Sequence, residues 1–193
     1  MVEKTTRMKH ILFTLKGCPF ELLDSREFIR MLSRKKDKAS VKYEYFVDDL
    51  AKLKHKPWEL YVVSRVLHHL DDLEVEFVCQ QYVKVSLGKY YLMDLCFPQL
   101  KMYLEVNEKA HASEKKQITD KDRMREIMDL TDFEGTVITT YVKNDKEKSK
   151  TLKNINLEVT SFVKRLKSKK EELLAEGKFN AFDPRTRHKS GPH

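Results

Sequence analysis

The stretch Tyr90–Arg125, YYLMDLCFPQLKMYLEVNEKAHASEKKQITDKDRMR, carries the strongest structural pattern of this chain. Its apolar spacing predicts a strand, a tight turn, a second strand and then a helix. Asp94 lies in the first strand and Glu105 ends the second. Antiparallel strands joined in this way bring both carboxylates to one end of a sheet, in apolar surroundings where charge is costly. Paired carboxylates repel each other unless a cation lies between them, and oxygen ligands favour magnesium, so the stretch predicts a metal site.

The order of polar residues in this stretch resembles the PD-(D/E)xK nuclease superfamily, and within it the branch of the very-short-patch repair endonuclease. In that branch an aspartate strand is followed by Glu-Val-Asp-Gly-x-x-His, and then by Asp-x-x-Arg at the start of a helix. The corresponding residues here are Asp94, then Glu105-Val106-Asn107-Glu108-Lys109-Ala110-His111, then Asp120-Lys121-Asp122-Arg123. The resemblance covers residues 57–166, and several spaced elements agree in order.

Two departures separate the chain from this pattern. Asn107 stands where the superfamily has the lysine of its motif, and Glu108 stands where the branch has a glycine. Both departures bear on proton transfer more than on the pair of carboxylates.

The resemblance implies an α/β, restriction-endonuclease-like core in which helices flank a central mixed β-sheet of about four to five strands. We expect residues 56–176 to form this nuclease core. Residues 1–55 are then an N-terminal extension that serves recognition or dimer contacts, and residues 177–193 are a flexible basic tail.

Apolar periodicity and turn residues place the other expected elements. Helices are expected at 25–32, at 43–53, from Pro57, from Asp120 and up to Gly177. Further strands are expected at 10–15, 75–85 and 137–142, with a hairpin turn at 86–89 and a polar connection at 112–119. The three central strands should be antiparallel, whereas a helical crossover favours parallel pairing of the last strand with the Glu105 strand.

Composition narrows the class of protein. The chain has 193 residues, 38 Lys plus Arg against 30 Asp plus Glu, and a net charge of +8, which favours a polyanionic partner. Cys18, Cys79 and Cys96 show no spacing typical of zinc or of a disulfide framework, and Cys79 and Cys96 are expected to be small core residues. We expect a cytoplasmic protein with no membrane partner, because no apolar run is long enough to cross a bilayer.

The resemblance also assigns roles at the site. Asp94, Glu105 and the Val106 carbonyl are expected to hold Mg²⁺, for which Mn²⁺ should substitute. Asn107 can position a water through its amide, and His111 is the candidate for proton transfer because its ordinary pKa lies near neutrality. Glu59 either reaches the metal site or only favours the first turn of its helix. The missing lysine could also be replaced from elsewhere, by Lys101, Lys109 or Lys121.

Candidate nucleic-acid contacts lie in three places. Arg123 and Arg125 are expected to hold a phosphate, although a surface ion pair with Asp120, Asp122 or Glu126 is the alternative. Arg34, Lys35 and Lys36 form a basic stretch that either contacts phosphate or is a solvated turn. The branch has a glutamine before the aspartate strand, which matches Gln80 or Gln81, and we assign the nucleic-acid contact to Gln81.

Three functions fit these observations. The first is a Mg²⁺-dependent endonuclease that hydrolyses duplex DNA, of the restriction, mismatch-nicking or homing type, and a homodimer if it cuts palindromes. The second is an RNA endonuclease of the cap-snatching or splicing type. The third is a nucleic-acid-binding module that has kept the fold and lost catalysis.

Overall fold

The computed structural model describes residues 40–53, 55–107, 114–140 and 152–185. The elements are α3 (Ser40–Ala51), α4 (Pro57–Leu70), β1 (Val78–Ser86), β2 (Lys89–Phe97), the 3₁₀ turn η1 (Pro98–Leu100), β3 (Met102–Asn107), α5 (Glu114–Thr131), β4 (Glu134–Thr139) and α6 (Leu152–Ala175). The strand expected at 10–15 and the helix expected at 25–32 lie outside the described residues.

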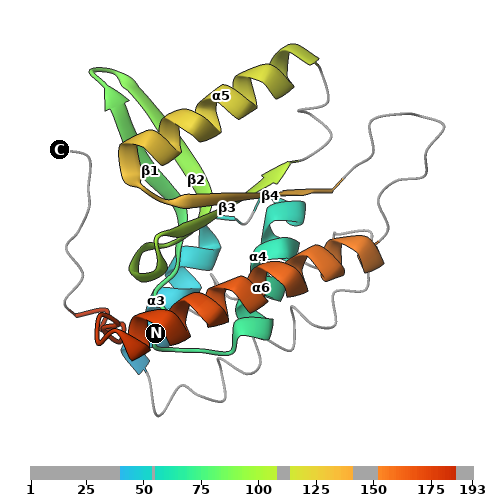
Figure 1. Ribbon diagram of the computed structural model, residues 1–193. Helices are drawn as coiled ribbons and strands as arrows, with labels where there is room; N and C mark the ends of the chain where they lie inside the picture. The colour runs from blue at the N-terminus through green and yellow to red at the C-terminus, as the bar shows by residue number, and fades with distance from the viewer. Residues whose placement is uncertain (1–39, 54, 108–113, 141–151, 186–193) are drawn as a thin grey trace.

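The four described strands form one mixed sheet in the order β1-β2-β3-β4. β1, β2 and β3 are antiparallel neighbours, whereas β4 is parallel to β3, as the helical crossover predicts. Helix α5 lies on one face of the sheet, and α4 and α6 lie on the other (Figure 1). This is the restriction-endonuclease-like α/β fold expected from the sequence.

The main core lies between the sheet and the pair α4 and α6. Helix α4 begins at Pro57, where the missing amide donor does no harm, and it buries Leu60, Val63 and Leu67 at helical spacing. Helix α6 contributes residues such as Val159 and Phe162 to the same core. Burial of these side chains orients α4, whose first turn carries Glu59 toward the sheet.

A second, smaller core lies under α5. Its buried members are Val78, Val83, Met93, Cys96, Tyr103 and Ile127. Tyr103 pairs with Gly135 across β3 and β4, and a Cβ at Gly135 would lie only 2.6 Å from the Tyr103 ring. A glycine is therefore required here so that the tyrosine can lie flat across β4.

The β1–β2 hairpin extends beyond the rest of the sheet (Figure 1, green). β1 pairs with β2 along the whole hairpin, from Val78↔Cys96 to Ser86↔Lys89. β3 pairs only with Leu95–Phe97 of β2, through Leu104, Tyr103 and Met102. Strands β2 and β3 therefore separate on the hairpin side of Leu95, and the outer part of the hairpin is a two-stranded ribbon.

The elements differ from the sequence expectation at three places. Helix α5 begins at Glu114, inside the segment expected to be a polar connection, because a sequence without an apolar stripe looks like a loop even where its residues have good helix propensity. β4 begins at Glu134, three residues before the expected start at Val137, and Tyr141 and Val142 lie outside the described residues. In the third place, helix α6 ends at Ala175, two residues before Gly177.

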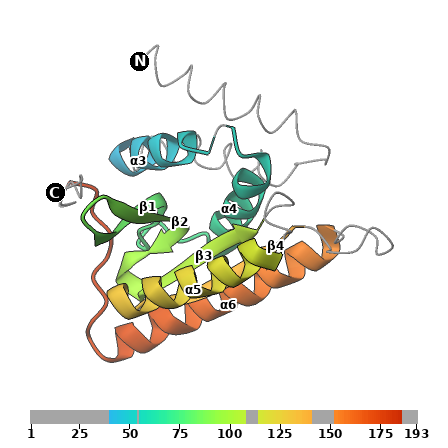
Figure 2. The same ribbon diagram turned by 90° about the horizontal axis from the view of Figure 1, so that it is seen from above.

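The segments flanking the expected nuclease core contribute to that core. Helix α3 precedes the boundary expected at residue 55, yet its Phe46 and Leu50 are buried in the main core. Phe182 lies in the segment expected to be a flexible tail, and it is buried against Tyr45, with ring centroids 4.9 Å apart. Figure 2 shows α3 close to the β1 edge of the sheet.

Two further expectations concern burial. Cys79 and Cys96 are buried free thiols, as expected of small core residues, and burial raises the pKa of both. In the part of the chain that the structure describes, no helix is long and apolar enough to cross a membrane.

Candidate active site

Asp94 and Glu105 meet at the point where β2 and β3 separate. The last paired residues of the two strands are Leu95 and Leu104, and the two acidic residues come next on each strand. Both line one cavity of about 460 Å³, together with Gln80, Asn107 and Arg123 among others. The separation of two neighbouring strands thus opens room for a ligand between two carboxylates.

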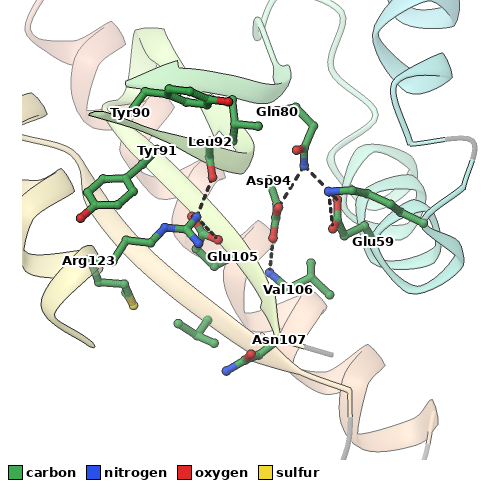
Figure 3. Close-up of a pocket in the computed structure, with 13 residues that line it drawn as sticks. Glu59, Gln80, Tyr90, Tyr91, Leu92, Asp94, Glu105, Val106, Asn107 and Arg123 are labelled. Carbon is green, nitrogen blue, oxygen red and sulfur yellow. Dashed lines mark hydrogen bonds and ion pairs between the residues drawn. The ribbon is translucent and has the colours of Figure 1, made fainter. Parts of the chain in front are cut away.

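The Asp94 carboxylate is held from two sides. Its Oδ2 accepts a hydrogen bond of 2.8 Å from the backbone N–H of Val106, and its Oδ1 accepts one of 3.0 Å from the Gln80 amide. The side chain is buried, so these bonds also compensate for lost hydration. Figure 3 shows Asp94 between Val106 on β3 and Gln80 on β1. The arrangement fixes the direction in which the carboxylate points.

Gln80 reaches the cavity because its backbone is unusual. Its φ is 55°, in the left-handed region that non-glycine residues rarely adopt. The same amide donates a second hydrogen bond of 2.9 Å to Glu59, so it bridges two acidic side chains (Figure 3). Strained backbone of this kind persists where the surroundings fix it, and it is frequent at functional sites.

Glu59 projects from the first turn of α4 toward this bridge. It is buried, and its carboxylate pairs with Lys56 at 2.8 Å, one helical turn earlier. Lys56 itself lines the cavity. A chain of contacts therefore runs from Lys56 through Glu59 and Gln80 to Asp94.

Glu105 faces Arg123, which comes from α5. The Arg123 guanidinium donates to both Glu105 oxygens at 2.9 Å and to the Leu92 carbonyl at 2.6 Å. Leu92 lies past the end of the β2–β3 pairing, so its carbonyl has no partner on β3 and the arginine satisfies it. Arg123 therefore bridges the two separated strands, and its Nε is buried without a hydrogen-bond partner.

The electrostatics of the cavity favour a bound cation. Burial, and then the charge of nearby Asp94, raise the pKa of Glu105 to about 9, even though the Arg123 ion pair lowers it. One arginine thus leaves the two carboxylates incompletely neutralised. Their oxygens and the Val106 carbonyl are the hard ligands that Mg²⁺ takes, so the residues fit such an ion. Within the described residues, no group of three or more His, Cys, Asp or Glu side chains is placed so that it could hold a metal ion by itself. Carbonyl or water oxygens would therefore have to complete the coordination.

The structure brings together most of the residues singled out from the sequence. Asp94, Glu105, Val106, Asn107 and Glu59 line the cavity or reach into it, and so does Arg123. His111, Arg34, Lys35 and Lys36 lie outside the described residues, as do Lys109 and the side chain of Lys121.

Three residues lie elsewhere than the cavity. Gln81 donates to the Tyr82 carbonyl and lines a different hollow, on the side of α5, so the structure places Gln80 rather than Gln81 beside Asp94. Arg125 is exposed, and two helical steps of about 100° turn it away from Arg123. Lys101 pairs with Asp132 at the opposite end of β3.

Sequence reasoning missed Lys56, Tyr90 and Tyr91 as cavity residues. The spacing of Lys56 and Glu59, three residues apart at the start of a helix, was a usable signal for the first. Tyr90 alternates with Leu92 and Asp94 along one strand, and Tyr91 lies on the opposite side of that strand, but the length of the two-stranded ribbon was not visible in the sequence.

The fold and the site define a restriction-endonuclease-like protein, and comparison with known proteins agrees. Residues 43–177 match the family model described as the N-terminal part of restriction endonucleases like PvuRts1 I, and the chain belongs to this family. Among solved structures it is similar to the 5-hydroxymethylcytosine-specific restriction enzyme AbaSI, with 31% identity and a TM-score of 0.61 over 77% of this chain and 53% of that one. The chain thus spans about half the length of AbaSI. No curated protein matches the chain.

Proposed function

We propose that this chain is a Mg²⁺-dependent DNA endonuclease that hydrolyses phosphodiester bonds at the cavity between β2 and β3. The observation that supports this most is the meeting of Asp94 and Glu105 at the separation of their strands, in a member of a restriction endonuclease family. The order of the site residues also supports a relation to the very-short-patch repair branch.

Phosphodiester hydrolysis needs an activated water and stabilisation of charge on the phosphate oxygens. Asp94, Glu105 and the Val106 carbonyl would hold the metal ion, which supplies a more acidic water and a counter-charge for the phosphate. Gln80 and Glu59 keep Asp94 in position, because the Gln80 amide bonds both carboxylates.

The remaining cavity residues act on the phosphate and the water. Arg123 already lies at the carboxylates, and its guanidinium can also contact a phosphate oxygen. Asn107 can orient a water through its side-chain amide. In the superfamily the motif lysine supplies positive charge at the site, and this chain has Asn107 in its place. We assign part of that charge to Lys56, since Lys56 lines the same cavity.

We extend the proposal to the substrate class. AbaSI is described as 5-hydroxymethylcytosine-specific, and we propose that this chain acts on DNA carrying the same base. This chain spans about half the length of AbaSI, so cleavage and recognition of the modified base are tested separately.

The test compares wild type and Asp94→Asn on three substrates: duplex DNA with 5-hydroxymethylcytosine, unmodified duplex DNA and single-stranded RNA. Each is incubated with Mg²⁺, with Mn²⁺ and with a chelator. We expect metal-dependent cleavage of duplex DNA by wild type, fastest on the modified duplex, and none by the variant. Cleavage in chelator, or full activity of Asp94→Asn, contradicts the metal site. Faster cleavage of RNA than of either duplex would identify RNA as the substrate in place of DNA. Cleavage of none of the three would favour a nucleic-acid-binding module without catalysis.

A further inference from the structure

The outer part of the β1–β2 hairpin exposes apolar and aromatic side chains close to the cavity. Leu87 at the turn is 98% exposed, and Tyr90 and Leu92 on β2 are 54% and 37% exposed. Single exposed apolar residues are ordinary on protein surfaces. Here they cluster on one short two-stranded ribbon. A ribbon without a third strand is only marginally stable, and exposed apolar side chains do not stabilise it.

Tyr90 and Leu92 share one face of the ribbon with Tyr82 and Lys84 of β1. Cross-strand partners lie on the same side of a sheet, and the register pairs Tyr82 with Leu92 and Lys84 with Tyr90. The rings of Tyr82 and Tyr90 stack with centroids 5.0 Å apart and an interplanar angle of 27°. We call Tyr82, Lys84, Tyr90 and Leu92, with Leu87 at the tip, the hairpin face.

The opposite face of the ribbon is already occupied. Val83 and Met93 pack with Ile127 of α5, and the Tyr91 hydroxyl donates to Glu126 of the same helix at 2.5 Å. Helix α5 therefore supports the ribbon from behind. The hairpin face points away from this support, and its side chains do not belong to either hydrophobic core that the described residues form.

The hairpin face continues into the active site. Tyr90, Leu92 and Asp94 alternate along β2, and Tyr90 and Leu92 line the same cavity as Asp94. At about 3.3 Å per residue, Tyr90 lies about 13 Å from Asp94 along the strand. Leu87 is in the turn beyond Lys89, where the chain reverses, so it lies at most about 23 Å from Asp94. Stacked base pairs are about 3.4 Å apart, so these distances correspond to about four and at most about seven base pairs.

We propose that the hairpin face binds duplex DNA beside the cleaved phosphate, by contacting bases and sugars within about seven base pairs. This rests on the proposed function only for the position of the cleaved phosphate. A two-stranded ribbon fits a major groove, aromatic and apolar side chains contact bases and sugars, and the exposed Lys84 is attracted to the backbone. The contribution of the tyrosines and Leu87 is consequently insensitive to salt, unlike that of phosphate contacts.

The test measures binding of labelled duplex DNA in chelator, where no metal-dependent cleavage occurs, over a series of salt concentrations. Tyr90→Ala and Leu87→Ser should each weaken binding about tenfold without changing the slope of log affinity against log salt. Lys84→Ala should lower that slope by about one. Photo-crosslinking to duplexes with single 5-iodouracil substitutions should capture Tyr90 only within about four base pairs of the cut.

Two variants control for folding and for exposure. Tyr90→Phe keeps the ring and its stacking, so it should bind as wild type does, and a loss equal to that of Tyr90→Ala would assign the effect to the hydroxyl and contradict the proposal. Leu157→Ala removes a leucine that is 61% exposed on α6, a helix that contributes no residue to the cavity, and should leave binding unchanged.

The two proposals fail in different ways. If wild type cleaves DNA and the hairpin variants bind as tightly as wild type, the hairpin proposal is wrong and the nuclease remains. If wild type binds DNA without cutting it, and Tyr90→Ala weakens binding, the nuclease is wrong and the binding face remains. A fall in melting temperature of Tyr90→Ala without any change in affinity shows a structural role, and also contradicts the binding face.

Discussion

The two ends of β2 differ in the strands with which they pair. From Leu95 to Phe97 the strand pairs with β3, Leu95 and Cys96 also pair with β1, and every residue is buried. From Lys89 to Asp94 it has β1 on one side only, and it carries the residues of the cavity and of the hairpin face. One strand therefore serves two purposes. Its paired end stabilises the fold. At its other end β2 has no pairing with β3, so polar side chains and backbone groups there are available to a ligand.

The largest contrast is expected between two adjacent residues at the point of separation. Asp94→Asn should lower cleavage by about a thousandfold or more while leaving the melting temperature near that of wild type. Leu95→Ala should do the reverse, because it empties a fully buried position and lowers the free energy of unfolding by about 2–5 kcal/mol. Denaturant unfolding and turnover per folded molecule measure both. Equal effects of the two variants on either quantity would remove the distinction between the ends.

The paired part of the sheet should not tolerate a methyl group at Gly135. Its Cβ would lie 2.6 Å from the Tyr103 ring, so Gly135→Ala should lower the free energy of unfolding by about 1–3 kcal/mol through overpacking. The double variant Gly135→Ala with Tyr103→Leu should recover part of that loss. No recovery would show that the ring is not the obstacle.

The released end should show its charge in the pH dependence of stability. The pKa of Glu105 is raised from 4.5 to about 9, so the metal-free folded chain holds a proton between these pH values that the unfolded chain has lost. Its free energy of unfolding should therefore fall as pH rises through this window, by at most about 1.4 kcal/mol per pH unit from this group.

Glu105→Gln cannot lose that proton and should flatten the profile, and Mg²⁺ should flatten the profile of wild type because it stabilises the ionised carboxylate. Thermal or urea unfolding from pH 5.5 to 8.5 measures the difference between wild type and variant. Parallel profiles in the absence of metal would mean that the Arg123 ion pair fully compensates for burial.

The smallest effect is expected from the matched pair of glutamines. Gln80→Leu removes the amide that holds Asp94 and Glu59, and should lower the cleavage rate about tenfold at saturating DNA. Gln81→Leu changes the next residue, which lines a different hollow, and should leave the rate unchanged. A larger loss from Gln81→Leu would restore the assignment made from the sequence.

Much of the fold follows from the sequence because local rules apply along most of it. The apolar spacing of α4 and α6, the proline at the start of α4 and the turn residues at 86–89 all predict the observed elements. The crossover through α5 predicts the parallel pairing of β3 and β4. The bounds of α5 and β4 are less well predicted, since polar helix turns and strand ends carry no apolar pattern.

The site is less predictable because it lies where strand alternation is interrupted. Cys79 and Leu95 pack in the main core, whereas Val83 and Met93, an even number of residues away on the same strands, pack under α5. Regular alternation would place each pair on one face. The left-handed φ of Gln80 lies at this interruption, and a sequence that obeys period two on both sides does not reveal which glutamine turns inward.

The carboxylates were predictable for a different reason. Asp94 and Glu105 lie on consecutive strands joined by the short turn η1, so their approach depends only on this hairpin-like connection between β2 and β3. Lys56 and Glu59 come from a helix that precedes this sheet, and their approach depends on how α4 packs on it. Contacts that follow from long-range packing are absent from local patterns.

The anchoring of Phe182 has a consequence for anyone who shortens the chain to fuse it to another protein. Residues 43–177 match the family model, yet the ring that completes the aromatic cluster around Tyr45 and Phe77 lies five residues past that limit. Its backbone N–H also donates to the Glu74 carbonyl, just ahead of β1. A fusion partner joined at residue 177 would remove Phe182 and these contacts, so a linker should begin only after residue 185.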